Sequence, residues 1–209
     1  MDVTEYILTV ISKESLEEKL WYLVGALGDG SLYMDGDKYV IEYGQKDVLW
    51  LEIAIKMRIE ALGYKPYLVK HKGGKYHKLK VYSKALYQIL KSLNNNDIAN
   101  ISINHFVSYL RGFFDAEGTI TKQDSKRIYA RISQKNRELL YKISLRLRSE
   151  LGINATDPFI NDKAGVYVIQ IPNYHLDRFI SIIKPCHPSK ITKYIALRNI
   201  PLTSFLSST

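Results

Sequence analysis

The segment LRGFFDAEG, Leu110 to Gly118, decides the fold because it places an acid at the end of a helix built to be buried. The C-terminal end of a helix carries partial negative charge, so a carboxylate there is unfavourable unless something compensates it. The segment YLVGALGDG, Tyr22 to Gly30, ends in the same way, with Asp29 where the other segment has Glu117. Two such endings in one chain need a common explanation.

The composition indicates a polyanionic partner. The chain has 209 residues, of which 30 are Lys or Arg and 21 are Asp or Glu, and its net charge is +9. Together with sixteen tyrosines, this excess of positive charge favours nucleic acid as the partner. Charge alone leaves open the alternative of a soluble protein that is merely basic.

The cysteine count and the N-terminus indicate the compartment. Cys186 is the only cysteine, which excludes an intrachain disulfide and fits a reducing environment. It lies beside His187, but the sequence offers no further spaced ligands for zinc, so we expect a structural role. We find neither a signal peptide nor the ~20 consecutive apolar residues that a membrane span needs. We therefore expect a protein that is not secreted: cytoplasmic in a prokaryote or archaeon, organellar or nuclear in a eukaryote.

The first half of the chain reads as alternating helices and strands. A capping box of Ser15 and Glu18 begins a helix that runs through Leu27. A strand is predicted at 38–44, a periodic helix ending at Gly63, a hairpin over 66–83 that turns at Gly73-Gly74, and a short helix over 84–93. The segment 94–97, NNND, is the most linker-like stretch.

The second half repeats this order, with a helix over 103–118, a strand over 126–133, a helix ending at Gly152, a strand over 165–172 and a helix over 174–183. A further short helix is expected near 191–199. Asp29 and Glu117 are 88 positions apart, and the pairs Gln45-Lys46 and Gln134-Lys135 are 89 apart. The spacing between these matched positions is nearly constant, which indicates a repeat. It predicts an α+β fold of two α-β-β-α-β-β-α halves, 1–97 and 98–209, related by a pseudo-twofold axis.

The two acid-terminated helices are expected to lie side by side. Gly25 and Gly28 in the first helix, and Gly112 and Ala116 in the second, put small residues on one face and allow close backbone approach. The C-terminal ends would then converge, bringing two carboxylates together with unpaired main-chain carbonyls. Such an oxygen-rich pocket suits a hard divalent cation such as Mg²⁺.

At this point the sequence resembles a known family. LRGFFDAEG resembles the LAGLIDADG motif of homing endonucleases at its Leu, Gly, Asp, Ala, acid and Gly positions, and YLVGALGDG resembles a less regular first copy. The resemblance, with its repeated flanking units, covers nearly the whole chain. It implies a single-chain, pseudo-symmetric, intron-encoded endonuclease whose motif helices form the interface between the halves. Their antiparallel sheets would form a saddle on the DNA major groove.

The resemblance also implies the chemistry. The last acid of each motif binds the catalytic metal ions, a role that falls to Asp29 and Glu117, with Gly28 and Ala116 completing the predicted metal set. Two or three Mg²⁺ ions, replaceable by Mn²⁺ or Ca²⁺ in structures, would hydrolyse both strands of a long site and leave short 3′ overhangs. The partner would be double-stranded DNA bound by a monomer, with the chain's own intron RNA as a further candidate partner.

Two matched pairs after the second strand of each half are further catalytic candidates. We expect Lys46 and Lys135 to contact the scissile phosphate or the attacking water, and Gln45 and Gln134 to order solvent. The alternative is that all four merely begin a helix; their recurrence in both halves favours function.

Strand alternation predicts the DNA-binding face. Side chains that alternate with apolar residues give it an Arg, Lys and Tyr lattice suited to phosphates and base edges. The expected members are Lys38, Lys70, Lys78, Lys80, Tyr82, Arg127, Tyr129, Arg131 and Ser133. Two other functions stay open: an RNA-splicing maturase or a non-cutting DNA-binding protein of the same fold, and a plain α/β protein in which both acids are helix stops.

Overall fold

The structure is a computed structural model that describes residues 2–70, 76–94, 97–122, 127–161 and 165–201. In the first half the elements are α1 (Val3–Lys13), α2 (Leu16–Gly25), the 3₁₀ turn η1 (Ala26–Asp29), β1 (Gly30–Asp35), β2 (Lys38–Gln45), the π-helical segment η2 (Trp50–Ile55), α3 (Lys56–Ala61), β3 (Tyr67–Lys70), β4 (His77–Tyr82) and α4 (Lys84–Asn94). In the second half they are α5 (Ile103–Glu117), β5 (Gly118–Lys122), β6 (Ile128–Gln134), α6 (Arg137–Ser149), β7 (Phe159–Asn161), β8 (Val166–Ile171), α7 (Asn173–Ile183) and α8 (Pro188–Arg198).

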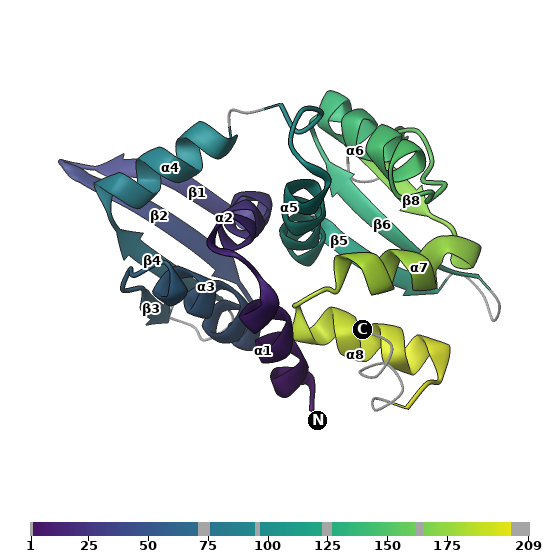
Figure 1. The fold of residues 1–209 in the computed structure, drawn as a ribbon, viewed down its shortest axis with the longest axis horizontal. Coiled ribbons are helices and arrows are strands. Elements are labelled where there is room, and N and C mark those ends of the chain that lie inside the picture. The colour runs from purple at the N-terminus through teal and green to yellow at the C-terminus, as the bar shows by residue number, and fades with distance from the viewer. Residues whose placement is uncertain (1, 71–75, 95–96, 123–126, 162–164, 202–209) are drawn as a thin grey trace.

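Each half contributes one antiparallel four-stranded sheet. The strand orders are β1-β2-β4-β3 and β5-β6-β8-β7, so corresponding strands occupy corresponding places. Figure 1 shows α2 and α5 side by side between the two sheets, with α4 covering the first sheet and α6 and α7 covering the second. The predicted α+β fold of two similar halves is confirmed.

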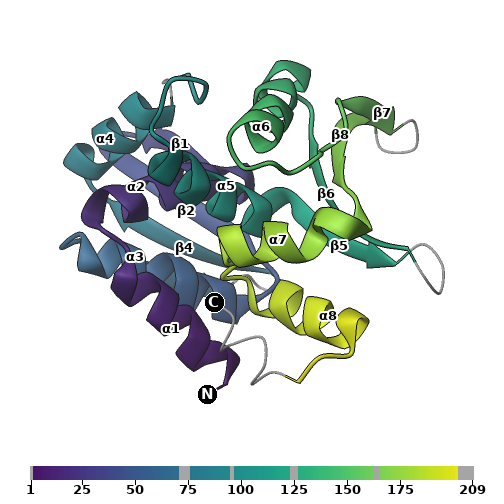
Figure 2. The ribbon, with the colours of Figure 1, turned by 45° about the vertical axis from the view of Figure 1, so that its right-hand side comes forward.

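Two helices lie outside the repeat. The sequence did not lead us to expect α1, whereas α8 matches the predicted terminal helix but begins earlier, at Pro188. Figures 1 and 2 both show α1 and α8 together at the same end of the molecule. The predicted hairpin turn at Gly73-Gly74 and part of the predicted linker lie outside the described residues. None of the described helices is both long and apolar enough to cross a bilayer.

The central pair of helices touches backbone to backbone. A methyl group on Gly25 would lie 2.0 Å from the carbonyl oxygen of Tyr109, and one on Gly112 would lie 2.1 Å from that of Tyr22. Because real side chains do not tolerate such distances, glycine is required at both positions. The predicted small-residue contact between the helices is confirmed, and it sets their C-terminal ends next to each other.

The ends of these two helices differ in detail. The capping box of Ser15 and Glu18 begins α2 as predicted, but α2 ends at Gly25, and Asp29 follows on a 3₁₀ turn. In α5 the regular helix continues to Glu117 itself. A 3₁₀ helix has fewer residues per turn than an α-helix, and this tighter turn places Asp29 at the C-terminal end of the α2–α5 pair.

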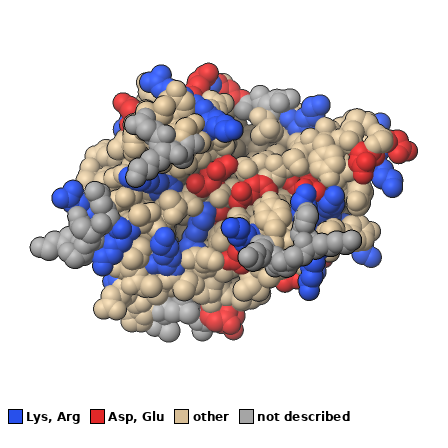
Figure 3. Space-filling view, turned by 180° about the vertical axis from the view of Figure 1, so that it is seen from behind, with Lys and Arg blue, Asp and Glu red and all other residues tan. Residues whose placement is uncertain are grey.

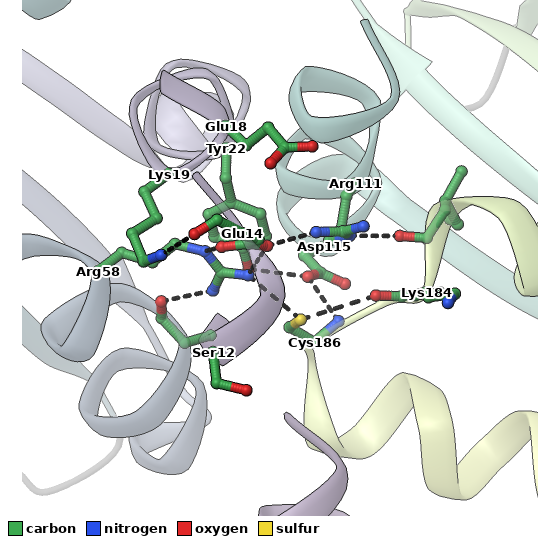
Figure 4. Close-up of polar contacts among 12 residues, drawn as sticks. Ser12, Glu14, Glu18, Lys19, Tyr22, Arg58, Arg111, Asp115, Lys184 and Cys186 are labelled. Atoms are coloured by element: carbon green, nitrogen blue, oxygen red, sulfur yellow. Dashed lines mark hydrogen bonds and ion pairs between the residues drawn. The ribbon is translucent and has the colours of Figure 1, made fainter. Parts of the chain in front are cut away.

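A buried ionic cluster locks the helix pair to its surroundings (Figure 4). Arg58 of α3 is fully buried and donates to Glu14 through Nε (2.8 Å) and Nη2 (2.6 Å). Arg111 of α5 pairs with the same carboxylate and donates through Nε to the carbonyl of Ile183, 2.5 Å away. Burial alone would raise the pKa of Glu14, but Arg58 and Arg111 hold it below its usual value.

Enlarging Gly25 should destabilise the fold. Because Gly25→Ala drives a methyl group against the Tyr109 carbonyl, the free energy of unfolding should fall by about 1–3 kcal/mol or more. Urea denaturation measures this, with Ser92→Ala on the exposed face of α4 as the control. A Gly25→Ala protein as stable as the control would show that the helices are not in backbone contact.

The Glu14 cluster should make stability depend on pH. Its folded-state pKa is depressed, so its contribution is present above the unfolded value of about 4.3 and is lost as pH falls through the folded value. Glu14→Gln should cost about 3–5 kcal/mol at pH 7, because it leaves two arginines unpaired. The gap between wild type and variant should narrow as pH falls below the unfolded value and through the depressed folded value. A gap independent of pH would refute the ionised pairing.

Candidate metal and DNA-binding site

The two motif acids meet where α2 and α5 end. A methyl group on Gly28 would lie 2.7 Å from Cγ and 2.9 Å from Oε1 of Glu117, so the glutamate side chain crosses directly over the residue before Asp29. Both acids are partly exposed. Burial raises the pKa of each, and the charge of Asp29 raises that of Glu117 further. Without a counter-charge, the pair is therefore costly to keep ionised.

A glutamine holds each acid in the same way. Gln45 donates through Nε2 to Oδ2 of Asp29 at 2.6 Å, and Gln134 donates to Oε1 of Glu117 at 3.2 Å. The other end of each amide accepts a bond from the next main-chain N–H, at 2.8 Å from Lys46 and 2.7 Å from Lys135. We expected the glutamines to order solvent; the structure shows them orienting the acids directly.

The lysines that follow these glutamines are exposed. Within the described part of the chain, the ammonium groups of Lys46 and Lys135 form no hydrogen bond or ion pair. They lie beside the acids along the chain, and their predicted contact with a phosphate or water stays a prediction.

Lys190 of α8 is a charged neighbour of the site that sequence reasoning missed. Its Nζ donates to the carbonyls of Phe114 and Asp115, each at 2.5 Å, and lies 3.5 Å from that of Ala116. The ammonium therefore covers the C-terminal end of α5, including one predicted metal-binding carbonyl. Burial lowers the pKa of Lys190 to about 8, although Asp115, Asp29 and Glu117 all act to raise it.

Asp115, two positions before Glu117, anchors the C-terminal segment rather than facing the site. It is fully buried and accepts bonds from the Tyr22 hydroxyl at 2.8 Å and from the main-chain N–H groups of Cys186 (2.8 Å) and His187 (3.2 Å). Burial raises the pKa of Asp115, whereas Lys190 and the bonds from Tyr22 and Cys186 lower it. Cys186 is buried, and its expected structural role stays a prediction.

The donor set fits a hard divalent cation. It offers two carboxylates that repel each other, both held by amides, at the meeting of two helix C-termini. Across the described ranges, no group of three His, Cys, Asp or Glu side chains forms a conventional metal cluster. Any ion here would complete its coordination with main-chain carbonyls, water and the oxygens of a substrate.

The surroundings of the two acids are unequal. Asp47 and Asn136 occupy matched positions in the two halves. The start of α8 covers Asp47, which accepts a bond from Ser189 Oγ at 2.5 Å and lies 3.6 Å from His187 Nδ1. Asn136 instead lines a cavity of about 520 Å³ between α2, α5 and α6. The groove that α8 fills beside one half is thus open beside the other.

The first sheet presents most of the predicted DNA-binding side chains. Lys78, Lys80 and Tyr82 alternate with the buried Leu79 and Val81, so they project away from the helices. Lys38 is exposed at the start of β2, in the same alternation.

Lys70 departs from this grouping. It pairs with His77, whereas Val69 pairs with Lys78, so the register places Lys70 on the opposite face from Lys78 and Lys80. Its inclusion in the DNA-binding face was wrong, because the sequence did not reveal how β3 pairs with β4.

Glu42 was not expected on the DNA-binding face. It projects from the middle of β2, with carboxylate oxygens 2.7 Å from Lys78 Nζ and 3.1 Å from Lys80 Nζ. The hydroxyl of Tyr33 also donates to it at 3.1 Å. Burial alone would raise the pKa of Glu42, but these partners lower it.

The second sheet follows the predicted alternation. Ile128, Ala130 and Ile132 are buried toward the helices, whereas Arg131 and Ser133 face outward and are partly exposed. Tyr129 shares their face but lies beneath Arg131, whose Cζ is 4.6 Å from the ring centroid. Arg127 is exposed just before β6. The face seen in Figure 3 has acids gathered across its middle, with lysines and arginines around them.

Comparison with known proteins finds a family model in the second half and relatives similar over most of the chain. Residues 107–184 match the model of the LAGLIDADG-like domain. The chain is 29% identical over 200 residues to the homing endonuclease I-ApeI of Aeropyrum pernix, covering 88% of each protein. It superposes on I-DmoI solved with DNA and Mn at a TM-score of 0.66 with 27% identity, covering 81% of this chain and 97% of that one.

A more distant match supports the fold alone. Full-length DUF199/WhiA from Thermatoga maritima has a TM-score of 0.63 and 15% identity, covering 98% of this chain and 70% of that one.

Two parallel helices that join paired sheets and end in paired acids are the arrangement that the resemblance of the two motifs implied. The predicted resemblance to LAGLIDADG homing endonucleases is confirmed by the domain model over 107–184 and by the similarity to I-ApeI and I-DmoI.

Replacing Lys190 should lower the free energy of unfolding, because it removes the positive charge beside three acids. Lys190→Met leaves Asp29, Asp115 and Glu117 without a counter-charge, so we expect a loss of about 1.5–3 kcal/mol in urea denaturation. Added Mg²⁺ should reduce the loss if it occupies the acids. Lys193→Met, on an exposed position of the same helix, is the control. Equal stability of the two variants would refute the role of Lys190.

Proposed function

We propose that this protein is a site-specific double-strand DNA endonuclease that uses Mg²⁺, and that it acts as a monomer. One observation carries the proposal: Asp29 and Glu117 converge at the α2–α5 interface between two similar halves, which we call the seam. Each acid is held by its own glutamine. Two strands require two nearly equivalent cleavage centres, and the repeat supplies one acid to each. The similarity to I-ApeI, named a homing endonuclease, and to I-DmoI, solved with DNA, supports this function.

The shape of the protein supports a duplex substrate. The two sheets lie on either side of the helix pair, and their outward faces carry Lys78, Lys80 and Arg131. The acids lie between the sheets, where the middle of a bound duplex would pass. A strand of the duplex would therefore run over basic side chains before and after it reached the acids. The net charge of +9 favours this association and makes it sensitive to salt.

The carboxylates of Asp29 and Glu117 would hold divalent ions, as related structures with Mn, Mg and Ca suggest. When bound, the ions supply an activated water and charge stabilisation for the phosphate and its leaving oxygen. Gln45 and Gln134 each bind one oxygen of an acid, and no hydrogen bond among the described residues engages the other oxygen. We propose two or three Mg²⁺ ions, with carbonyls of Gly28 and Ala116 near them.

The two exposed lysines complete the proposed centres. Lys46 and Lys135 follow the glutamines directly and have freedom to reach a phosphate. On this proposal each ammonium binds the scissile phosphate or holds the attacking water beside it. The chain's own intron RNA remains a proposed further partner.

Removing either acid should abolish cutting while leaving DNA binding. Asp29→Asn or Glu117→Gln removes a charge that holds the ions, and several kcal/mol of lost stabilisation corresponds to about 10³-fold in rate. The measurement is double-strand cleavage of a target selected from a randomised duplex library in Mg²⁺, with binding followed by gel shift.

The matched controls remove an exposed acid by the same chemical change. Asp157→Asn and Glu138→Gln should cut normally, because their carboxylates are 71% and 77% exposed in surface ion pairs. Normal cutting by both site variants would end the metal assignment. Tight binding without cutting by the wild type would favour the non-cutting alternative.

A further inference from the structure

Arg131 is held in place before any DNA arrives. It lies in the central strand β6, directly opposite Gln170 of β8. Its Nε donates to Oε1 of Gln170 at 3.4 Å, and its guanidinium lies over the ring of Tyr129, with Cζ 4.6 Å from the centroid. Two neighbours on the same face thus contact one cationic group, Gln170 at its Nε and Tyr129 with its ring.

This arrangement leaves the Nη1 and Nη2 groups of Arg131 available to bind a base. Among the contacts described for Arg131, none engages its Nη1 or Nη2 atoms, and the side chain is partly exposed on the outward face of the sheet. The two N–H groups of this fork match the O6 and N7 acceptors of guanine in the major groove. Prior fixation lowers the entropy that is lost when the fork binds.

The first half carries the opposite charge at the matched position. Glu42 lies 89 positions before Arg131, the spacing of the Gln45 and Gln134 pair, and it too faces outward from the central strand. Its carboxylate binds Lys78 and Lys80, so no arginine fork stands there. A carboxylate repels the acceptor edge of guanine. The two sheets therefore present a carboxylate, Glu42, and a guanidinium, Arg131, at matched positions.

We propose that Arg131, positioned by Gln170 and Tyr129, reads one guanine in the half-site beneath the second sheet, and that Glu42 prevents the same reading in the first. The target is then asymmetric at this pair of positions, although the protein fold is symmetric. This inference rests on the proposed binding of duplex DNA, but it does not require that the DNA be cut.

The test is a binding selection from a randomised duplex library in Ca²⁺, followed by sequencing of the bound DNA. The wild type should require guanine at one position, and only in one half-site. Arg131→Ala should reduce discrimination at that position alone by about 5- to 150-fold. Arg131→Lys keeps the charge but not the fork, so it should lose much of the same discrimination while retaining affinity.

Two further variants separate reading from general attraction and from folding. Lys122→Ala removes an exposed charge from the same sheet and should weaken binding to all sequences equally. Gln170→Ala frees the arginine and should lower the guanine preference partially, with the thermal unfolding midpoint recording whether each variant folds.

The inference is overturned if Arg131→Lys keeps every base preference of the wild type. A uniform loss of affinity in Arg131→Ala would also overturn it, since that marks a phosphate contact, as would wild-type binding without base preference. Sequence-selective binding without cleavage would refute the proposed nuclease function and leave this inference standing.

Discussion

The structure depends on the direct contact between the backbones of α2 and α5. Gly25 and Gly112 allow this contact, and any larger residue at either position would collide with a carbonyl of the partner helix. Since the helices run in the same direction, their negative ends and their terminal acids arrive together. The contact that joins the two halves is therefore also the contact that creates the site.

Bringing negative groups together has a cost that the rest of the chain offsets. Lys190 places an ammonium against the last carbonyls of α5, and Asp115 binds the start of the segment that delivers this lysine. Further along the helix pair, Glu14 is held between Arg58 and Arg111. These contacts come from α8, α3 and the α1–α2 connection, so elements on both sides stabilise the seam. They also make it unequal, because α8 fills only one of the two matched grooves.

The sequence predicted the features that repeat. The paired acids, the small residues between the helices, the glutamines and the alternation of β4 and β6 recur at fixed spacing or fixed period, and the structure places them as expected. Lys190 could not be found in this way, because it has no counterpart 89 positions earlier: Ile101 stands there. Lys70 was misjudged because strand register, which decides the neighbours of a side chain, cannot be read from one strand. Glu42 shares the parity of Lys38 in β2, so alternation could have placed it on the DNA-binding face.

Asp115 illustrates a different limit. It lies within the motif, yet its partners are the Tyr22 hydroxyl and two main-chain N–H groups about 70 positions away, which no local pattern reveals. The direct bonds from Gln45 and Gln134 to the acids likewise depend on how far β2 and β6 extend beneath the helix ends. The boundary between the halves at 97 and 98 stays a prediction.

The most direct measurement is anomalous diffraction from crystals of the protein with a bound target duplex and Mn²⁺. The account predicts anomalous peaks within coordination distance of the carboxylates of both Asp29 and Glu117, at the seam between the sheets. An ordered duplex on the two sheets with no Mn²⁺ at either carboxylate would contradict it.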